Sequence, residues 1–495
     1  MPRVFSKGLL GYLPANVLQG IVGFATLMAF TRLLSPSDYG SYVLALGVSN
    51  IAYTLVFNWM EAAMARFYPA ERNTDPEAPH LYGTIYRLFL AVALLFLALL
   101  AAGAALWPTH DANQQGLKIA IIVGLLSNAP RSLVKLAQEQ RRSVGRVGAA
   151  SGIDMLMTGG GFLLALAFAA LGLKGAAPFA GLGVMALIVM PFVVREDWGR
   201  ALRGRFSASA ARAYSQYGYP ISLSLIMTIA LYTVDRFMIA HFLTEADAGA
   251  YHAGFSIASR VIDVLFIWFG AAGVPALINA LEQGGDGALA AEGKRQITLM
   301  ALVLFPAVAG IIAVAAPLSA VLIGEGLRGR ALSITPLVTV GALLAGMNNG
   351  YFLLSFTLAK KTRLLVVAMM IPALANIALN WLLIPRLGLV GAAGSYLASF
   401  AIGITAAAIL GLKAKPLPVP VFELLKIAGA AGLMAVVLGL IPPLGTAGDL
   451  AVKPALGIAI YGGLACVFDL GGARAFADKL LTKVPFGNRL MMGHR

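Results

Sequence analysis

The segment Asp38-Tyr39-Gly40-Ser41-Tyr42 has a second copy at residues 247–251, Asp-Ala-Gly-Ala-Tyr, so that both copies read Asp-x-Gly-x-Tyr. Residues 171–177, Leu-Gly-Leu-Lys-Gly-Ala-Ala, return in the same way at residues 387–393 as Leu-Gly-Leu-Val-Gly-Ala-Ala. The two offsets, 247 − 38 = 209 and 387 − 171 = 216 residues, are nearly equal. A nearly constant offset is typical of a chain that contains two copies of one half. Because the residues between the motifs are strongly apolar, the duplication predicts a membrane transporter with two lobes.

The composition places most of the chain in lipid. Hydrophobic residues make up 59% of the 495 residues and charged residues only 12%, whereas soluble proteins carry about 25% charged residues. The apolar stretch 8–30 follows Arg3 and Lys7 and predicts a first transmembrane helix, since it is too long for the core of a cleavable signal and no small-residue cleavage site follows it. The single cysteine, Cys466, excludes internal disulfides and cysteine-based metal sites. We expect neither a metal nor a cofactor.

Fourteen apolar segments have the length that a membrane-spanning helix needs, about 17–25 residues. The fourth is short for a span, and the eighth is polar for a lipid environment. Their limits are 8–31, 40–60, 88–106, 117–130, 150–171, 176–194, 219–243, 250–278, 298–323, 332–358, 364–385, 388–411, 424–442 and 451–470.

Lysine and arginine are distributed unequally between the two sides of these segments. With the N-terminus placed in the cytoplasm, 28 of the 37 lie on the cytoplasmic side and 7 on the outer side, while Arg236 and Arg260 fall within spans. Since positive charge marks cytoplasmic loops, we expect a multi-pass membrane protein with both termini in the cytoplasm. The same bias explains the net charge of +15 without a nucleic acid partner. The basic connections 61–87, 131–149 and 195–218 are expected to lie along the anionic inner leaflet.

Two further pairs of segments extend the repeat. Residues 11–14, Gly-Tyr-Leu-Pro, align with residues 218–220, Gly-Tyr-Pro, at predicted helix starts. Residues 31–34, Thr-Arg-Leu-Leu, align with residues 235–238, Asp-Arg-Phe-Met, at predicted helix ends. The first six helices therefore correspond to the next six. Because six is even, the two halves point the same way through the membrane and are related by an axis along its normal.

The predicted fold is all-α and integral to the membrane. Fourteen transmembrane helices form two parallel six-helix lobes, at residues 1–212 and 213–415, and an additional C-terminal pair. This pair and a basic cytoplasmic tail occupy residues 416–495 and follow a proline-rich linker at residues 413–420, which proline makes stiff.

Charged residues inside the spans are the candidate functional groups. A charge at mid-bilayer costs about 2.5–3.5 kcal/mol on insertion scales, so such residues tend to be paired, to face a cavity and to be functional. The candidates for substrate binding are Arg236, Arg260 and Arg32. The candidates for supporting these arginines or coupling an ion are Asp235, Asp263 and Glu61.

Each candidate also has a structural interpretation. Asp263 follows Arg260 by three residues, so the two can pair on one helix face, and this pair can be purely structural. Arg32 lies at a predicted helix end, where a long side chain can reach the membrane surface without any further role. Arg236 is deeper and adjacent to an acid, which favours a function.

Several segments resemble one family of transporters. Residues 8–12, Gly-Leu-Leu-Gly-Tyr, and residues 31–40, Thr-Arg-Leu-Leu-Ser-Pro-Ser-Asp-Tyr-Gly, resemble the opening of bacterial polysaccharide transporters. These are the Wzx-like lipid-linked oligosaccharide flippases of the multidrug/oligosaccharidyl-lipid/polysaccharide exporter superfamily. Residues 234–236 with 249–251 resemble that family's helix 7–8 region, and residues 384–393 resemble its helix 11–12 turn. The resemblance spans the first twelve helices.

The resemblance implies a V-shaped pair of lobes that works by alternating access. It implies that an undecaprenyl-diphosphate-linked oligosaccharide, a unit of exopolysaccharide, capsule or O-antigen, moves from the cytoplasmic to the periplasmic leaflet. A diphosphate is anionic and needs arginine or lysine to receive it, so Arg236, Arg260 and Arg32 are expected to neutralise it. The implied partners are the lipid-linked glycan, membrane lipids, and a polysaccharide polymerase with other export machinery.

Two other functions stay open. One is an ion-coupled multidrug-type exporter of the same superfamily, for which an acid-rich site in the first lobe is expected; helices one to six carry only Asp154 and Glu61, near their cytoplasmic ends. The other is an enzyme, a membrane glycosyltransferase, glycan polymerase or ligase. Such enzymes need a sizeable outer loop with catalytic residues, and the predicted outer loops are short. The chain also lacks a Gly-x-x-x-x-Gly-Lys-Ser/Thr phosphate-binding motif, and we expect no enzymatic activity.

Overall fold

The computed structural model describes residues 2–475, with the side chains of residues 14–229 and 233–475. Within this part the secondary structure is helical, and it contains no strand. The predicted all-α class is therefore confirmed. The predicted basic tail lies outside the described residues beyond position 475, as do the side chains of residues 11–13 in the repeat.

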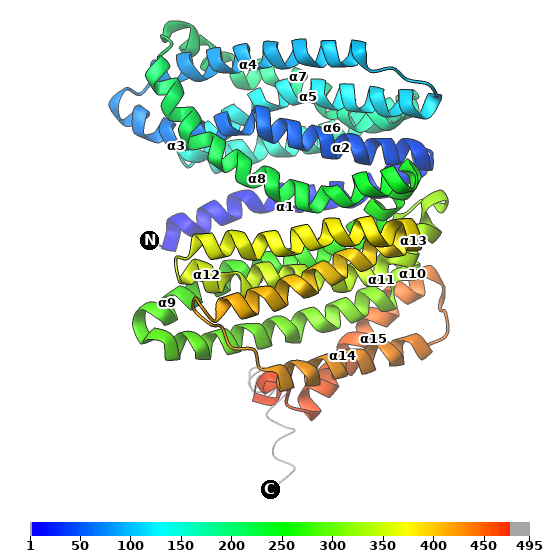
Figure 1. Ribbon diagram of the computed structural model, residues 1–495. Helices are drawn as coiled ribbons and strands as arrows, with labels where there is room; N and C mark the ends of the chain where they lie inside the picture. Colours follow the sequence, from blue (N-terminus) through cyan, green and yellow to red (C-terminus); the bar gives the residue numbers. More distant parts are fainter. Residues whose placement is uncertain (1, 476–495) are drawn as a thin grey trace, which may run out of the picture. The chain divides into compact units, whose positions relative to one another are not determined.

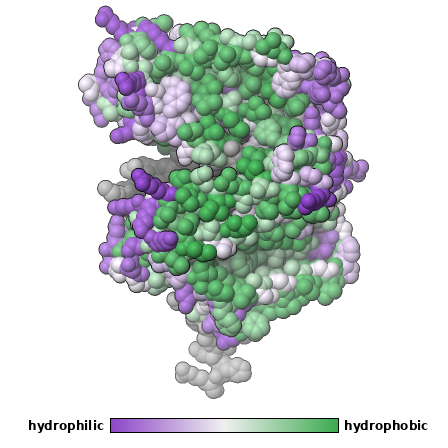
Figure 2. All heavy atoms as spheres, in the orientation of Figure 1, coloured by the Kyte–Doolittle hydropathy of each residue, from purple (hydrophilic) through white to green (hydrophobic). Residues whose placement is uncertain are grey.

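Many of the helices are long and apolar. Eleven of those in the described chain can cross a membrane by length and composition, or twelve if the two parts of one helix that meet at 48°, Ala208–Ile229 and Thr233–Phe242, form one span. Figure 2 shows hydrophobic side chains over the middle of the helices and hydrophilic ones at their ends. This distribution is that of a multi-pass membrane protein.

The chain divides into two compact units, which are described separately. Unit 1 consists of residues 1–252 and 323–327. In it α7 packs on α4, α5 and α6, α1 packs on α6, and α8 packs on α2 and α3 (Figure 1). Its helices are α1 (Pro2–Leu33), α2 (Pro36–Val56), α3 (Asn58–Thr74), α4 (Pro79–Leu106), α5 (Ala112–Ser143), α6 (Val147–Ala170), the 3-10 turn η1 (Lys174–Ala176), α7 (Ala177–Arg203), α8 (Ala208–Phe242) and the beginning of α9 (Glu245–Ala313).

Unit 2 consists of residues 253–322 and 328–495. Two of its helices are interrupted by a glycine with positive φ, Gly285 in α9 (φ 66°) and Gly388 in α13 (φ 60°). Besides most of α9, it contains α10 (Ala315–Leu322), α11 (Glu325–Met347), the π-helical turn η2 (Asn348–Phe352), α12 (Leu354–Leu358), α13 (Thr362–Gly411), α14 (Val421–Leu440), α15 (Gly445–Val467) and η3 (Leu470–Gly472).

These units are defined by internal packing, whereas the predicted lobes are defined by the repeat. Helix α8 and the start of α9 pack within unit 1, although the repeat assigns them to the second half of the chain. The lobe boundaries at residues 212 and 415 stay a prediction.

The two copies of Asp-x-Gly-x-Tyr have the same local structure. Asp38 lies in the first turn of α2, where its carboxylate accepts a hydrogen bond from Ser35 Oγ (2.7 Å) while its amide donates to that oxygen (3.1 Å). Asp247 and Thr244 form the same reciprocal pair at the start of α9, with distances of 2.6 and 3.1 Å. Each motif therefore begins a helix by capping it. In the other motif, Gly172 (φ 87°) and Gly388 occupy equivalent positions and both have positive φ, which glycine adopts at little cost.

The glycines of the first motif lie where two backbones meet. A Cβ atom at Gly40 would stand 1.9 Å from the carbonyl oxygen of Glu245, and one at Gly249 would stand 3.1 Å from the amide nitrogen of Gly40. The first distance is shorter than real Cβ atoms allow, and the second is tighter than most. The two motif copies therefore pack directly against each other, within unit 1, through their glycines.

The segments predicted as connections contain more helix than the apolar spans indicate. Residues 61–87 contain most of α3 and the beginning of α4, and α5 runs to Ser143, well past the predicted span 117–130. Helix α8 begins at Ala208, before the start predicted at residue 219. These segments continue as helices because they pack on one another; hydropathy alone locates only their apolar parts.

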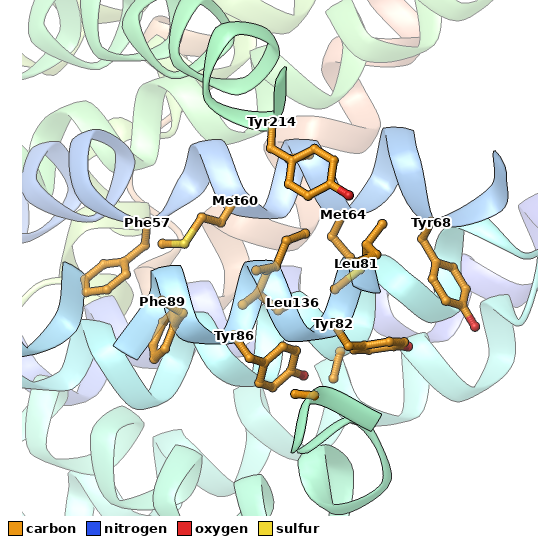
Figure 3. Close-up of a cluster of buried hydrophobic side chains, with 14 of the residues drawn as sticks. Phe57, Met60, Met64, Tyr68, Leu81, Tyr82, Tyr86, Phe89, Leu136 and Tyr214 are labelled. Atoms are coloured by element: carbon orange, nitrogen blue, oxygen red, sulfur yellow. The ribbon is translucent and has the colours of Figure 1, made fainter. Parts of the chain in front are cut away.

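The core at this end of unit 1 is rich in aromatic residues and methionine (Figure 3). Three side chains of α3, together with the residue that precedes this helix, pack with four side chains of α4 and one leucine of α5. They are Phe57 before α3, Met60, Met64 and Tyr68 of α3, Leu81, Tyr82, Tyr86 and Phe89 of α4, and Leu136 of α5. All nine are buried, so α3 contributes to the core of unit 1 and does not merely lie on its surface.

The close approach at Gly40 leads to a prediction. Gly40→Ala should lower the free energy of unfolding by about 1–3 kcal/mol, since the added methyl group requires the backbone at Glu245 to move. Gly103→Ala in α4, where a Cβ would meet nothing within 4 Å, is the matched control and should leave stability unchanged or slightly raised. Thermal unfolding of the two purified variants measures this; equal midpoints would contradict the packing.

Candidate functional site

A stripe of polar side chains runs along α5 inside unit 1. Asn128, Ser132, Lys135, Gln138 and Arg142 follow one another at intervals of three or four residues, which is the spacing of one helix face. Three of them, Asn128, Ser132 and Gln138, are fully buried. A buried polar group costs free energy unless it is hydrogen-bonded. The neighbouring helices supply the partners.

At its beginning, the stripe is bonded to α2. Ser49 Oγ donates to the carbonyl oxygen of Gly124 (3.1 Å), and Asn128 Nδ2 donates to the carbonyl oxygen of Ser49 (3.1 Å). All three residues lie within the apolar spans. These bonds hold α2 and α5 together where no water competes.

Glu61 is the buried acid next to this stripe. It lies in α3, outside the apolar spans, and its side chain accepts hydrogen bonds from the hydroxyl of Tyr53 and from Ser132 Oγ (3.1 Å). Burial raises the pKa of its carboxyl from the ordinary 4.5 to about 7, although both hydrogen bonds and the charge of Lys135 act to lower it. Glu61 can therefore gain or lose a proton near neutral pH, a property found at functional sites.

Asp154 of α6 lies at the C-terminal end of the stripe. Its carboxylate accepts from Lys135 Nζ (3.1 Å), from Gln138 Nε2 (2.9 Å) and from the guanidinium of Arg142. Arg142 also pairs with Glu139 at 2.6 Å. Because two cations and an amide surround this buried carboxylate, its role is to join α5 to α6.

Asp235, one of the predicted candidates, is hydrogen-bonded to the tyrosine of the second Asp-x-Gly-x-Tyr copy. Tyr251 donates its hydroxyl to Asp235 Oδ2 (3.0 Å), and Asp235 is only 2% exposed. Nearby in the same motifs, Ser41 Oγ donates to Glu245 Oε2 (2.5 Å). Arg236 follows Asp235 in α8 and is half-buried. Asp235 is thus bonded into the packing of the motif.

Arg32 ends α1 and is exposed. Its guanidinium donates to the carbonyl oxygen of Met28 in the same helix (2.9 Å). This bond ties the side chain to the backbone of the preceding turn near the helix end. The geometry agrees with a structural contribution at the helix end, and substrate binding by Arg32 stays a prediction.

The remaining two candidates lie in unit 2. Arg260 is half-buried and Asp263 is exposed, one turn apart on α9. Their spacing allows the pairing that the sequence predicts, and this pairing stays a prediction. Unit 1 thus holds Glu61, Arg32, Asp235 and Arg236, and unit 2 holds Arg260 and Asp263.

Unit 2 also contains an apolar groove, which the sequence did not indicate. It has a volume of about 760 Å³ and lies between α9, α14 and α15. Its lining includes Leu302, Pro306, Ile311, Met434, Leu438 and Ile458, with Lys453 and Tyr461 as its polar members. Lys453 is paired with Asp449 at 3.1 Å, and both are buried.

A comparison with known protein families shows to which family the chain belongs. Residues 29–328 match the model of a family described as polysaccharide biosynthesis protein. The chain belongs to this family. The resemblance inferred from the repeat motifs is thereby confirmed. No curated protein sequence matches the chain at a significant level.

Solved structures agree in fold. A structure described as lipid II flippase MurJ in an inward closed conformation superimposes with a TM-score of 0.73 and 13% identity, over 92% of this chain and 98% of that one. An inward-facing multidrug resistance MATE family transporter of the MOP superfamily gives a TM-score of 0.58 and 14% identity, over 86% of this chain and 96% of that one. At such identities the likeness establishes the fold alone.

The position of Glu61 leads to a prediction about pH. Since its pKa in the folded protein is above the ordinary value, its stabilising contribution is fully present below about pH 4.5 and is lost as the pH rises through about 7. The change is on the order of 3 kcal/mol. Glu61→Gln keeps the neutral form and should flatten the pH profile of thermal unfolding between pH 5 and 8.

Glu282→Gln, at an exposed position, is the control for this measurement and should leave the profile unchanged. If Glu61→Gln also leaves the slope between pH 5 and 8 as it is in the unaltered protein, Glu61 does not titrate in this range.

Proposed function

We propose that the protein is a flippase of the bacterial inner membrane that moves an undecaprenyl-diphosphate-linked oligosaccharide from the cytoplasmic to the periplasmic leaflet. The observation that carries the proposal is membership of the polysaccharide biosynthesis family, matched over residues 29–328. The fold shared with a lipid II flippase supports it. The glycan is a unit of exopolysaccharide, capsule or O-antigen, and a polysaccharide polymerase with other export machinery receives it.

The proposed architecture has fourteen spans in two parallel lobes that alternate access. Helix α9 has 69 residues, about 100 Å at 1.5 Å per residue, whereas the hydrocarbon core is about 30 Å thick. The break at Gly285 divides it into two spans, and the break at Gly388 divides α13 likewise. Eleven apolar helices and bent α8 make twelve, and the two breaks raise the number of proposed spans to fourteen. Equivalent caps at Asp38 and Asp247 support parallel halves, with both termini cytoplasmic.

The chemistry of the head group assigns roles to the arginines. A diphosphate is recognised best by guanidinium groups, which bind its oxygens in pairs. Arg236 and Arg260 lie within apolar spans, where a charged side chain is costly and is therefore expected to have a function. In this proposal they neutralise the diphosphate during its passage, Arg32 assists, and Asp235 and Asp263 orient them.

Glu61 is the proposed coupling group. Of the candidate acids, it is the one outside the apolar spans that is buried and changes charge near neutral pH. Its bond to Ser132 and its proximity to Lys135 tie its protonation to the α5 stripe. A proton taken up by Glu61 removes a charge from the interior of unit 1, which alters the packing of α3 against α5.

The groove in unit 2 suits the lipid part of the substrate. Its walls are almost wholly apolar, and burial of apolar surface is favourable at about 25 cal/mol per Å². An isoprenoid chain that lies in this groove remains attached while its head group crosses. In this proposal the groove binds the lipid chain and the arginines bind the diphosphate.

Filling the groove provides a test. Gly462 lines it and Gly463 does not, and a Cβ at either position meets nothing within 4 Å. Gly462→Phe should reduce glycan export about tenfold or more, since the ring occupies the volume of the chain. Gly463→Phe is the matched control. Equal export by the two variants, at equal membrane levels, would rule out the groove as the site of the lipid.

The function itself is tested by deletion of the gene and analysis of lipid-linked glycans in each leaflet. We expect accumulation on the cytoplasmic side, restored by the unaltered gene. Arg260→Ala should restore export about tenfold less well, because a charge-assisted bond of about 1.5–3 kcal/mol is lost, while Arg260→Lys should retain part of the activity.

Arg363→Ala, at an exposed position at the start of α13, is the control. Full export by Arg260→Ala would remove the arginine from the mechanism without affecting the flippase assignment. No accumulation after deletion, together with export of cationic dyes, would instead favour the multidrug-type exporter.

A further inference from the structure

A polar cavity lies between the C-terminal ends of α3, α5 and α7 in unit 1. It has a volume of about 130 Å³ and is lined by four arginines, Arg72, Arg141, Arg146 and Arg200. We call it the arginine pocket. The distribution of positive charge predicts that this end of the helices faces the cytoplasm. In the sequence these arginines belong to the 28 basic residues predicted on the cytoplasmic side.

Two of the four arginines are fixed in the wall. Arg141 donates to the carbonyl oxygens of Ala137 (2.7 Å) and Val193 (3.1 Å). Arg200 donates to the Tyr82 hydroxyl (3.4 Å), and its guanidinium carbon lies 5.5 Å from the centre of the Tyr82 ring. Tyr82, one of the core residues labelled in Figure 3, thus contacts Arg200 in the wall of the pocket.

The carboxylates of the pocket do not balance its positive charge. Asp197 is buried and accepts from Tyr86 (3.4 Å), with Arg200 at 3.5 Å. Arg200 also lies 3.6 Å from Glu77, outside the lining. The second acid of the lining, Glu196, is exposed. The lining itself holds four guanidinium groups and two carboxylates, an excess of two positive charges, and Glu77 beyond it is shared between Arg200 and Arg203.

The excess belongs to Arg72 and Arg146. Both are exposed, and in the described part of the chain neither side chain forms a hydrogen bond or an ion pair. Basic residues near helix C-termini also offset the helix dipole. That explains Arg141, which bonds to carbonyl oxygens, but not two arginines with free donors that line one cavity, Arg72 from the last turn of α3 and Arg146 from the connection between α5 and α6.

We propose that the arginine pocket binds the phosphate group of an anionic ligand. Guanidinium groups match phosphate oxygens in geometry and charge, and a doubly charged phosphate balances the excess. A cavity of about 130 Å³ far exceeds the roughly 10–15 Å³ that a single water molecule needs, so it has room for a phosphate group. Its source is an anionic phospholipid of the inner leaflet, which basic pockets between membrane helices bind, or a soluble phosphate compound.

A bound phosphate also stabilises unit 1. It bridges Arg72 of α3, Arg146 after α5 and Arg200 of α7, whose helix ends otherwise repel one another through their charges. The site is separate from the proposed transport function, so either can be wrong without the other.

The test compares two double variants of the full-length protein in a neutral detergent. Arg72→Gln with Arg146→Gln removes the unbonded arginines. Arg195→Gln with Arg212→Gln removes the same charge from exposed positions that are in unit 1 but do not line the pocket. Ligand binding is followed as the rise in thermal midpoint on addition of phosphatidylglycerol in mixed micelles, or of inorganic pyrophosphate, with phosphatidylcholine as the neutral lipid.

We expect the pocket variant to bind at least about tenfold more weakly and the control variant to change less than about twofold. The single change Arg146→Gln should have an intermediate effect. A loss seen with phosphatidylglycerol alone identifies a lipid head group, and a loss with pyrophosphate identifies a soluble phosphate. Equal losses in both double variants, or no response of the unaltered protein to either probe, would overturn the proposal.

Discussion

A polar group that is buried among apolar helices must find its partner within the protein, because no water is available there. Unit 1 meets this requirement along one face of α5. Asn128 bonds to α2, Ser132 to Glu61 of α3, and Lys135, Gln138 and Arg142 to Asp154 of α6. The same bonds that satisfy these groups fix the order in which four helices pack. Glu61, the acid proposed for coupling, is bonded to this stripe through Ser132.

The repeat adds a second constraint, set by backbone contact. The two copies of Asp-x-Gly-x-Tyr cap their helices in the same way, and their glycines allow α2 and the start of α9 to touch. Asp235 is held by the tyrosine of the second copy. An acid that the sequence marks as a candidate for coupling is thereby part of the packing, whereas Glu61, in the same group of predicted residues, has the burial and the pKa that suit a proton.

Much of the fold could be predicted. The apolar segments, the glycine break before residue 389 and the capping of both motif copies follow from periodicity and local chemistry, which act over a few residues. The ends of α3, α5 and α8 could not. Charged residues end a hydropathy segment, but the helix continues wherever those residues pack on a neighbouring helix. The site was predicted less well for the same reason: Arg72, Arg146 and Arg200 are far apart in the chain, and only packing brings them to one cavity.

By itself, the sequence determined that this is a helical membrane protein with an internal duplication, that it resembles polysaccharide transporters, and which few charges lie within its spans. These properties depend on composition and on short motifs, so they can be read without knowing which helices touch. The tertiary structure decided which of those charges are bonded, which acid is buried at a position where it titrates near neutral pH, and where the unbonded arginines gather. Such properties depend on distances between separate helices, and those distances are set by the repeated glycines and by the polar stripe of α5.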